Sequence, residues 1–303
     1  MTQRTRSSPA APHPRLNRRD FVARIGLVGT VLAVAGDPAR AVPADPRAVT
    51  IDANVSLFRW PFRRLPLDET AALLKKMSDF GVDVAWAGSF EALLHRDIGG
   101  VNDRLAEECA RAGGRLVPFG TVNPALPDWE EDLRRCHEVH RMPGIRLFPN
   151  YHGYTLGDAA VPRLLRGAAE RGLVVQLTVA MEDVRTQHPL MCVPEVDVRP
   201  LAGLLEPVGA PRVMLLNAGR GLPAATLKAL AARGVCFDLS RVEGQGGVGA
   251  FLRSLPTGRV LFGTHAPFLN YEAALIKIHE SELAAETAAQ VLGGNAREFL
   301  RPG

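Results

Sequence analysis

Polar side chains with chemical potential stand in the first strand-like run of the sequence. This run, "AVTIDANVS" at residues 48–56, carries Asp52, Asn54 and Ser56 at alternate positions. Because alternate residues of a strand point to the same face, we expect these three side chains to share one face. A carboxylate, an amide and a hydroxyl at one place can orient a bound molecule by hydrogen bonds.

Later strand-like runs, and the segments that follow them, supply the other candidates. A histidine can exchange a proton near neutral pH, so His265 in "RVLFGTHAPF" is the candidate acid–base residue, with Arg146 and His188 as further catalytic candidates. An arginine can hold a carboxylate through two parallel hydrogen bonds, which suits Arg146 or Arg185. The candidate substrate-binding residues are Asn54, Ser56, Arg59, His152, Gln176, Thr178, Arg185, Asn217 and Asp238.

His265 also has a purely structural interpretation. In that interpretation it is a buried side chain that hydrogen-bonds to Asn54 and Ser56 and fills space in the barrel. The residue types alone do not separate the two interpretations.

Eight such apolar runs alternate with amphipathic helical patterns from residue 48 onward. The runs are nearly continuous in apolar residues, as in parallel strands that are covered on both faces. Four helical patterns end at a glycine, which favours a left-handed helix cap: Gly81, Gly113, Gly172 and Gly234. Eight strands, most followed by a helix, predict a single-domain (β/α)8 TIM barrel over residues 42–303. The competing architecture is a doubly wound open sheet, and the absence of a GxGxxG turn after the first run argues against a nucleotide-binding version of it.

Residues 1–41 differ from the rest of the chain in charge. They contain seven arginines and two aspartates, a net charge of +5, while all 303 residues sum to +4. The remainder therefore carries −1, which offers no electrostatic reason to expect a nucleic-acid partner or binding to an anionic membrane surface.

The same leader has the features of an export signal. A twin arginine, Arg18-Arg19, precedes an apolar run at residues 22–35, and that run is shorter than the roughly 20 residues of a membrane-spanning helix. We predict a twin-arginine signal over residues 1–41, a periplasmic location, and no membrane span after signal removal. The alternatives are an ordinary secretory signal or a basic disordered tail.

Six short fragments, in order along the chain, support a family assignment. They are "IDANVS" (51–56), "GIRLFPNYHGY" (144–154), "RGLVVQLT" (171–178), "LLNAG" (215–219), "FGTHAPF" (262–268) and "GGNAREFL" (293–300). Together they resemble the amidohydrolase-related superfamily, in the branch that includes aminocarboxymuconate-semialdehyde decarboxylase and dicarboxylate lactonases. The resemblance covers most of residues 48–300 and implies a barrel with a hydrolase or lyase site at its strand ends.

The resemblance also implies where metal ligands would stand, and the first strand departs from the family there. The family pattern is Asp-x-His-x-His, whereas this chain keeps Asp52 and has Asn54 and Ser56 in place of the histidines. Neutral amide and hydroxyl oxygens bind zinc poorly. We therefore expect no metal ligands in this strand.

The other family positions are altered as well. Thr178 stands at the histidine of the fifth strand, and Asn217 stands at the histidine of the sixth. The Gly-Ser-Asp-x-Pro of the last strand becomes "GTHAP", which puts His265 at the position of the family's catalytic aspartate. These substitutions lead us to predict that the protein has no metal site at the usual positions and no cofactor.

We interpret the chain as an exported enzyme, a hydrolase or lyase whose partner is a small carbonyl or carboxylate substrate. One alternative is a non-catalytic barrel that binds a small ligand or a protein partner. The other is a hydrolase whose metal has moved to His152, His188 and His265, each of which lies in or after a predicted strand.

Overall fold

The computed structural model of the protein describes residues 49–208, 211–218 and 222–301. The predicted export signal at residues 1–41 lies outside these residues. The described part contains eight parallel strands: β1 (Ile51–Leu57), β2 (Val84–Ser89), β3 (Leu116–Thr121), β4 (Gly144–Leu147), β5 (Val174–Thr178), β6 (Arg212–Leu216), β7 (Cys236–Asp238) and β8 (Val260–Leu261).

The strands pair in chain order, each with the next, from β1 to β8. The segment that follows β8 then meets β1. The backbone N–H of Ala53 donates to the carbonyl of Phe262, and that of Ser56 donates to the carbonyl of Ala266, both at 2.9 Å. These hydrogen bonds bring the last strand back to the first, which confirms the predicted (β/α)8 barrel.

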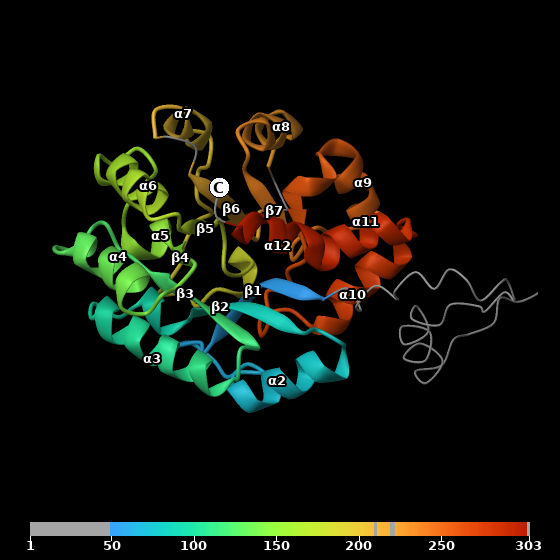
Figure 1. Cartoon of the computed structure of the whole chain (residues 1–303), viewed down its shortest axis with the longest axis horizontal. Helices are drawn as coiled ribbons and strands as arrows, with labels where there is room; N and C mark the ends of the chain where they lie inside the picture. Colours follow the sequence, from blue (N-terminus) through green and yellow to red (C-terminus); the bar gives the residue numbers. More distant parts are fainter. Residues whose placement is uncertain (1–48, 209–210, 219–221, 302–303) are drawn as a thin grey trace, which may run out of the picture. The chain divides into compact units, whose positions relative to one another are not determined.

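Helices surround the strands (Figure 1). They are α2 (Thr70–Asp79), α3 (Ile98–Arg111), α4 (Trp129–Glu138), α5 (Pro149–His152), α6 (Ala160–Glu170), α7 (Leu201–Leu205), α8 (Ala224–Ala232), α9 (Gly247–Ser254), α10 (Tyr271–Glu280), α11 (Ala285–Ala289) and α12 (Asn295–Leu300). Gly81, Gly113, Gly172 and Gly234 follow helices at positive φ, as the sequence predicts. No helix of the described residues is long and apolar enough to span a bilayer.

Two apolar layers hold the barrel together. An inner cluster draws members from seven of the eight strands, among them Ala53, Trp86 and Phe119, and therefore fills the barrel interior. A larger cluster joins the outer faces of the strands to the helices. This arrangement explains the nearly continuous apolar runs, because each strand is covered on both faces.

The alternation of β1 is interrupted, which corrects one expectation. The pairing with β2 shifts register between Asp52 and Val55. Ala53 belongs to the inner cluster, yet Asn54 and Ser56 also hydrogen-bond across the barrel to residues of other strands. Asp52 instead contacts the segment after β8. The irregularity thus separates Asp52 from Asn54 and Ser56, which the sequence placed on one face.

Candidate active site at the mouth of the barrel

A network of buried amides and carboxylates joins β1, β6 and β7 at their carboxyl ends. The side-chain amide of Asn54 donates to Asn217 Oδ1 at 2.8 Å and to Asp238 Oδ2 at 2.6 Å. The Ser240 hydroxyl donates to Asn217 Oδ1 at 2.8 Å, and the Asn217 backbone N–H donates to Asp238 Oδ1 at 2.9 Å. Burial raises the pKa of Asp238, while these donors act in the opposite direction. Three predicted site residues, Asn54, Asn217 and Asp238, therefore do lie together.

Arg146 crosses the barrel interior and is held by protein acceptors. Its guanidinium donates to Gln176 Oε1 at 2.9 Å, to the Val55 carbonyl at 2.8 Å and to Ser56 Oγ at 3.2 Å. A fourth, longer contact of 3.4 Å reaches the Trp86 carbonyl. Burial lowers the pKa of Arg146 to about 10, so the side chain stays cationic at neutral pH. Ser56 and Gln176 thus accept hydrogen bonds from Arg146 in this structure. The guanidinium of Arg146 is therefore occupied by acceptors within the barrel.

His265 follows β8 in a left-handed backbone conformation, with φ of 57°. Non-glycine residues rarely adopt this conformation, and it often marks functional positions. The imidazole is 2% exposed, stacks on Phe268 with ring centroids 5.0 Å apart, and places Nε2 2.6 Å from the Met181 carbonyl. Since a carbonyl oxygen only accepts hydrogen bonds, Nε2 carries the proton and Nδ1 carries the lone pair.

The charge state of His265 follows from its surroundings. Burial, together with the nearby positive charges of Arg241 and Arg146, lowers its pKa to about 3. The imidazole is therefore neutral at physiological pH, which corrects the expectation of a histidine that titrates near neutrality. The backbone N–H of His265 donates to the Asn54 carbonyl at 2.9 Å, but among the described residues the imidazole makes no hydrogen bond to the side chain of Asn54 or Ser56, which the purely structural interpretation expected.

Asp52 joins the first strand to the last. Its carboxylate accepts hydrogen bonds from the Thr264 hydroxyl at 2.5 Å and from the Thr264 backbone N–H at 3.0 Å. It also accepts from the Asn54 backbone N–H at 3.0 Å. Burial raises the pKa of Asp52 from 3.8 to about 6, and the hydrogen bonds limit that rise. Its contacts give Asp52 a role in closing the barrel.

Sequence reasoning missed Arg241, which lies three residues after β7. Its side chain is buried, with 7% exposure, and its Nη1 makes no hydrogen bond. Its neighbour Ser240 belongs to the network at the mouth. The signal was present in the sequence, since residues just after barrel strands face the site, but the predicted strand ended at Ser240 and Asp238 was the only site candidate taken from it.

The other predicted residues lie apart from this network. Arg59 pairs with Glu69 at 3.1 Å, and Arg185 pairs with Asp183 at 2.7 Å, both with exposed arginine side chains. Thr178 ends β5, where its buried hydroxyl makes no hydrogen bond.

Two of the predicted histidines lie outside the network as well. His152 bonds to the Ala92 carbonyl at 2.8 Å, and His188 stacks on Phe62. Neither histidine forms a metal group with His265, because the described residues contain no cluster of three or more His, Cys, Asp or Glu side chains that could hold a metal. The proposed relocation of a metal to these histidines is therefore wrong for this structure.

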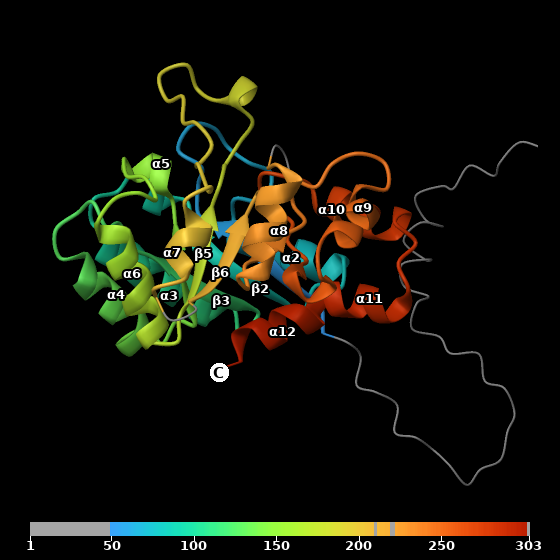
Figure 2. The ribbon, with the colours of Figure 1, turned by 90° about the horizontal axis from the view of Figure 1, so that it is seen from above.

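Aromatic side chains pack over the mouth. Trp60 contacts Phe62, Phe90, Tyr151 and Phe268 with ring centroids 4.7 to 6.3 Å apart. We call these five residues the aromatic cluster. The β1–α2 loop and the β5–α7 loop extend beyond the same end of the barrel in Figure 2. They are joined by an ion pair between Arg63 and Glu182 at 2.8 Å.

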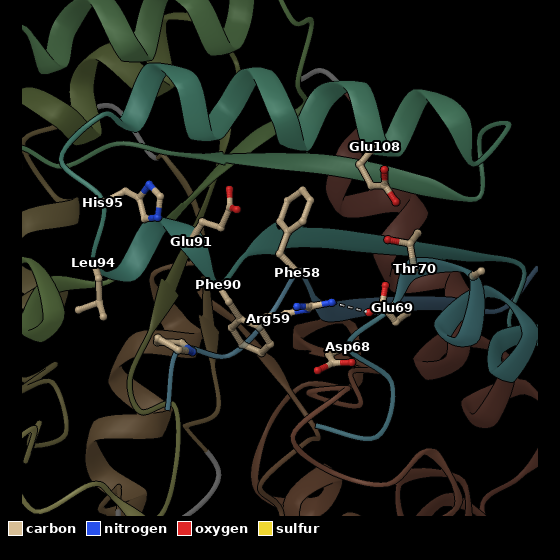
Figure 3. A pocket seen from close by; sticks show the side chains of 12 residues that line it. Phe58, Arg59, Asp68, Glu69, Thr70, Phe90, Glu91, Leu94, His95 and Glu108 are labelled. Atoms are coloured by element: carbon tan, nitrogen blue, oxygen red, sulfur yellow. Dashed lines mark hydrogen bonds and ion pairs between the residues drawn. The ribbon is translucent and has the colours of Figure 1, made fainter. Parts of the chain in front are cut away.

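A separate cavity of about 710 Å³ lies between the β1–α2 loop, the segment after β2, and α3. Figure 3 shows Arg59 directed towards Glu69 in its wall, with Phe58 and Phe90 nearby. The carboxylates of this wall are already paired with arginines: Asp68 with Arg64, Glu69 with Arg59, Glu91 with Arg104 and Glu108 with Arg111. This cavity therefore presents few free charges to a ligand.

Comparisons with known proteins agree with the fold. A family model described as Amidohydrolase matches residues 63–301. No curated protein matches the sequence.

Solved structures match over most of the chain. The 5-carboxyvanillate decarboxylase of Sphingomonas paucimobilis is 16% identical, with a TM-score of 0.69 over 84% of this chain and 100% of that one. A 2,6-dihydroxybenzoate decarboxylase complexed with 2,6-dihydroxybenzoate is 17% identical, with a TM-score of 0.68 over 84% and 98%. A dihydroxybenzoic acid decarboxylase of Polaromonas sp. JS666, with bound manganese and 2-nitroresorcinol, is 15% identical, with a TM-score of 0.68 over 82% and 97%.

The manganese in the Polaromonas enzyme contradicts our prediction that this protein has no cofactor and no metal site at the usual positions. The prediction rested on the altered residues alone. The side chains at the mouth of this barrel do not fit such a centre: Asp238 and Asp52 already accept hydrogen bonds, and Arg146 adds a positive charge.

Proposed function

Because the chain belongs to the amidohydrolase family, we propose that the mouth of its barrel is the active site of a lyase or hydrolase that acts on a small aromatic carboxylate. The structural relatives named above are decarboxylases of such compounds, which supports a lyase of this kind. Within the aromatic cluster, Phe62, Tyr151 and Phe268 are only partly buried, and aromatic side chains of this kind suit an aromatic substrate ring.

The observation that carries this proposal is the state of His265. Its imidazole is buried, neutral, and fixed through Nε2 to the Met181 carbonyl, which leaves Nδ1 as a proton acceptor. A general base needs an available lone pair in a fixed position, and His265 has both. The two arginines that lower its pKa make the same region favourable for an anion.

An anionic substrate would change the proton affinity of this imidazole. A carboxylate beside His265 stabilises the imidazolium and raises its pKa, so the ring becomes able to accept a proton from a substrate hydroxyl. The imidazolium can then give that proton to the ring carbon that bears the carboxylate. The bond between that carbon and the carboxylate breaks, its electron pair stays with the ring, and carbon dioxide leaves. The phenolate that remains regains its proton from solvent.

The test is turnover of hydroxybenzoates by the purified protein, measured as carbon dioxide release and as the decarboxylated product by chromatography. Parallel assays contain manganese or a chelator, so that the result does not depend on metal supply. We expect turnover of at least one compound, and His265→Asn should reduce it by roughly 100-fold or more. Asparagine tolerates the left-handed backbone of residue 265.

The matched control is His137→Asn, since His137 is exposed on α4 and should leave turnover unchanged. Folded protein that converts no compound in either buffer would refute the proposal. Equal activity of His265→Asn and the native protein would remove His265 from it. Saturable binding without turnover would instead favour the non-catalytic, ligand-binding alternative.

A further inference from the structure

Arg241 is one of two buried arginines in the described part of the chain, and the two differ in their partners. The guanidinium of Arg146 donates to protein acceptors on several strands. Nη1 of Arg241 is buried and donates to none. Burial of a cationic donor without an acceptor is costly, which makes Nη1 of Arg241 a candidate for a partner from outside the chain.

The backbone beside Arg241 is held in place at the mouth. The hydroxyl of Ser240 donates to Asn217 Oδ1, and its carbonyl accepts from Lys277 Nζ, both at 2.8 Å. Two residues earlier, Asp238 belongs to the same network. The guanidinium also lies close enough to His265 for its charge to affect that imidazole. Arg241 is therefore within electrostatic reach of the candidate acid–base residue.

We propose that Arg241 is the residue that binds the substrate carboxylate and selects anionic over neutral aromatic compounds. This inference rests on the proposed function. A planar guanidinium with a free N–H matches a carboxylate in charge and geometry. The other candidates are less suited, because Arg146 is saturated by the barrel and Arg185 is exposed and paired with Asp183.

The proposal also links binding to acid–base chemistry. A carboxylate on Arg241 neutralises a charge that disfavours protonation of His265, so substrate binding itself would prepare the imidazole to accept a proton. A neutral analogue could accept a hydrogen bond from Nη1 but would bring no negative charge, so it would leave the pKa of the imidazole unchanged. Arg241 thus distinguishes substrates by charge both when the carboxylate binds and when His265 accepts a proton.

The first test is equilibrium binding of two probes, benzoate and its neutral isostere benzamide, measured by calorimetry on the native protein and variants. We expect the native protein to prefer benzoate, and Arg241→Gln to weaken benzoate binding by about 10-fold or more while benzamide is unaffected. Arg185→Gln serves as the matched control and should keep the preference. Unchanged benzoate affinity in Arg241→Gln, or no benzoate binding to the native protein, overturns the inference.

The second test requires no ligand. If Nη1 has no protein partner, Arg241→Met should not lower the urea midpoint of unfolding of the free protein. A clear drop in that midpoint would assign Arg241 a structural role and overturn the inference. The inference and the proposed function can also fail separately. Charge-selective binding through Arg241 without turnover refutes only the function, while turnover with the same KM in Arg241→Gln refutes only the inference.

Discussion

Burial determines the charge of two residues where the first strand meets the segment after β8. These residues are Asp52 and His265. Asp52 is held with a pKa near 6 and His265 with a pKa near 3, in each case mainly because a charged form loses solvation. The two shifts affect stability in opposite directions as the pH falls. Asp52 takes up its proton more readily when folded, whereas His265 takes up its proton more readily when unfolded.

The first prediction concerns the acid sensitivity that His265 causes. Between its ordinary pKa of 6.5 and its folded pKa of about 3, only the unfolded chain binds the proton, so stability falls as the pH falls. Relative to His265→Asn, the native protein should lose about 2 kcal/mol of unfolding free energy between about pH 7 and about pH 5. Urea unfolding at both pH values measures this, and His137→Asn is the control. A constant difference between native protein and His265→Asn would contradict the shift.

The second prediction concerns Arg146 as a structural cation. Arg146→Met leaves Gln176, the Val55 carbonyl and buried carboxylates without their donor or counter-charge. The expected loss is roughly 3–5 kcal/mol of unfolding free energy, measured by urea denaturation. Arg166→Met, at an exposed position on α6, should change it by less than about 0.5 kcal/mol. A loss as small as that of the control would show that Arg146 is not needed by the barrel.

At the scale of single elements, β2 makes room for Arg146. Gly88 in β2 faces the guanidinium so closely that an added Cβ would lie 2.7 Å from Nη1 of Arg146. The glycine is therefore required by close approach, since its neighbour is fixed by hydrogen bonds. On β1, the register shift after Asp52 is a second local backbone feature that positions the polar side chains of the barrel. It directs Asn54 and Ser56 to partners across the barrel.

The third prediction follows from that close approach. Gly88→Ala should destabilise the protein by about 1–3 kcal/mol, because the new methyl group displaces Arg146 from its acceptors. Thermal or urea unfolding measures the effect. Gly258→Ala is the matched control, as an added Cβ there meets nothing within 4 Å. Equal unfolding free energies of Gly88→Ala and Gly258→Ala would mean that Arg146 can move away from residue 88 without loss of stability.

At the scale of the whole molecule, closure depends on one short junction. Only two residues form β8, and the backbone hydrogen bonds to β1 are made by the segment after it, residues 262–266. The carboxylate of Asp52 supports this junction through two hydrogen bonds from Thr264. Export through residues 1–41 stays a prediction, because these residues lie outside the described part of the chain.

The fourth prediction concerns this junction. Thr264→Val removes the hydroxyl that donates to ionised Asp52, and should cost about 1–3 kcal/mol of unfolding free energy at neutral pH. Well below pH 6 the carboxyl of Asp52 is protonated in the folded protein, so the cost should be smaller there. Urea unfolding of native protein and Thr264→Val at neutral pH and well below pH 6 measures the two costs. Thr287→Val on α11 is the control. A cost that does not change with pH would contradict the assigned role of Asp52.

The sequence by itself determined the barrel and most of its elements. Apolar runs and glycine caps are local signals, and they predicted the strands and the helix ends that the structure contains. Strand order also followed from the sequence, because a chain of alternating strands and helices closes most simply in chain order. The gathering of Asn54, Asn217 and Asp238 could be foreseen for the same reason, as each stands near a strand end.

Only the tertiary structure decided what each polar group does. Whether Arg146 faces a substrate or the barrel, and whether Arg241 has a partner, depends on contacts between residues far apart in sequence. The register shift in β1 and the neutral state of His265 likewise arise from packing that no local pattern records. Hydrogen-bond partners and desolvation are properties of the closed barrel, so residue types alone could nominate the site but not assign its roles.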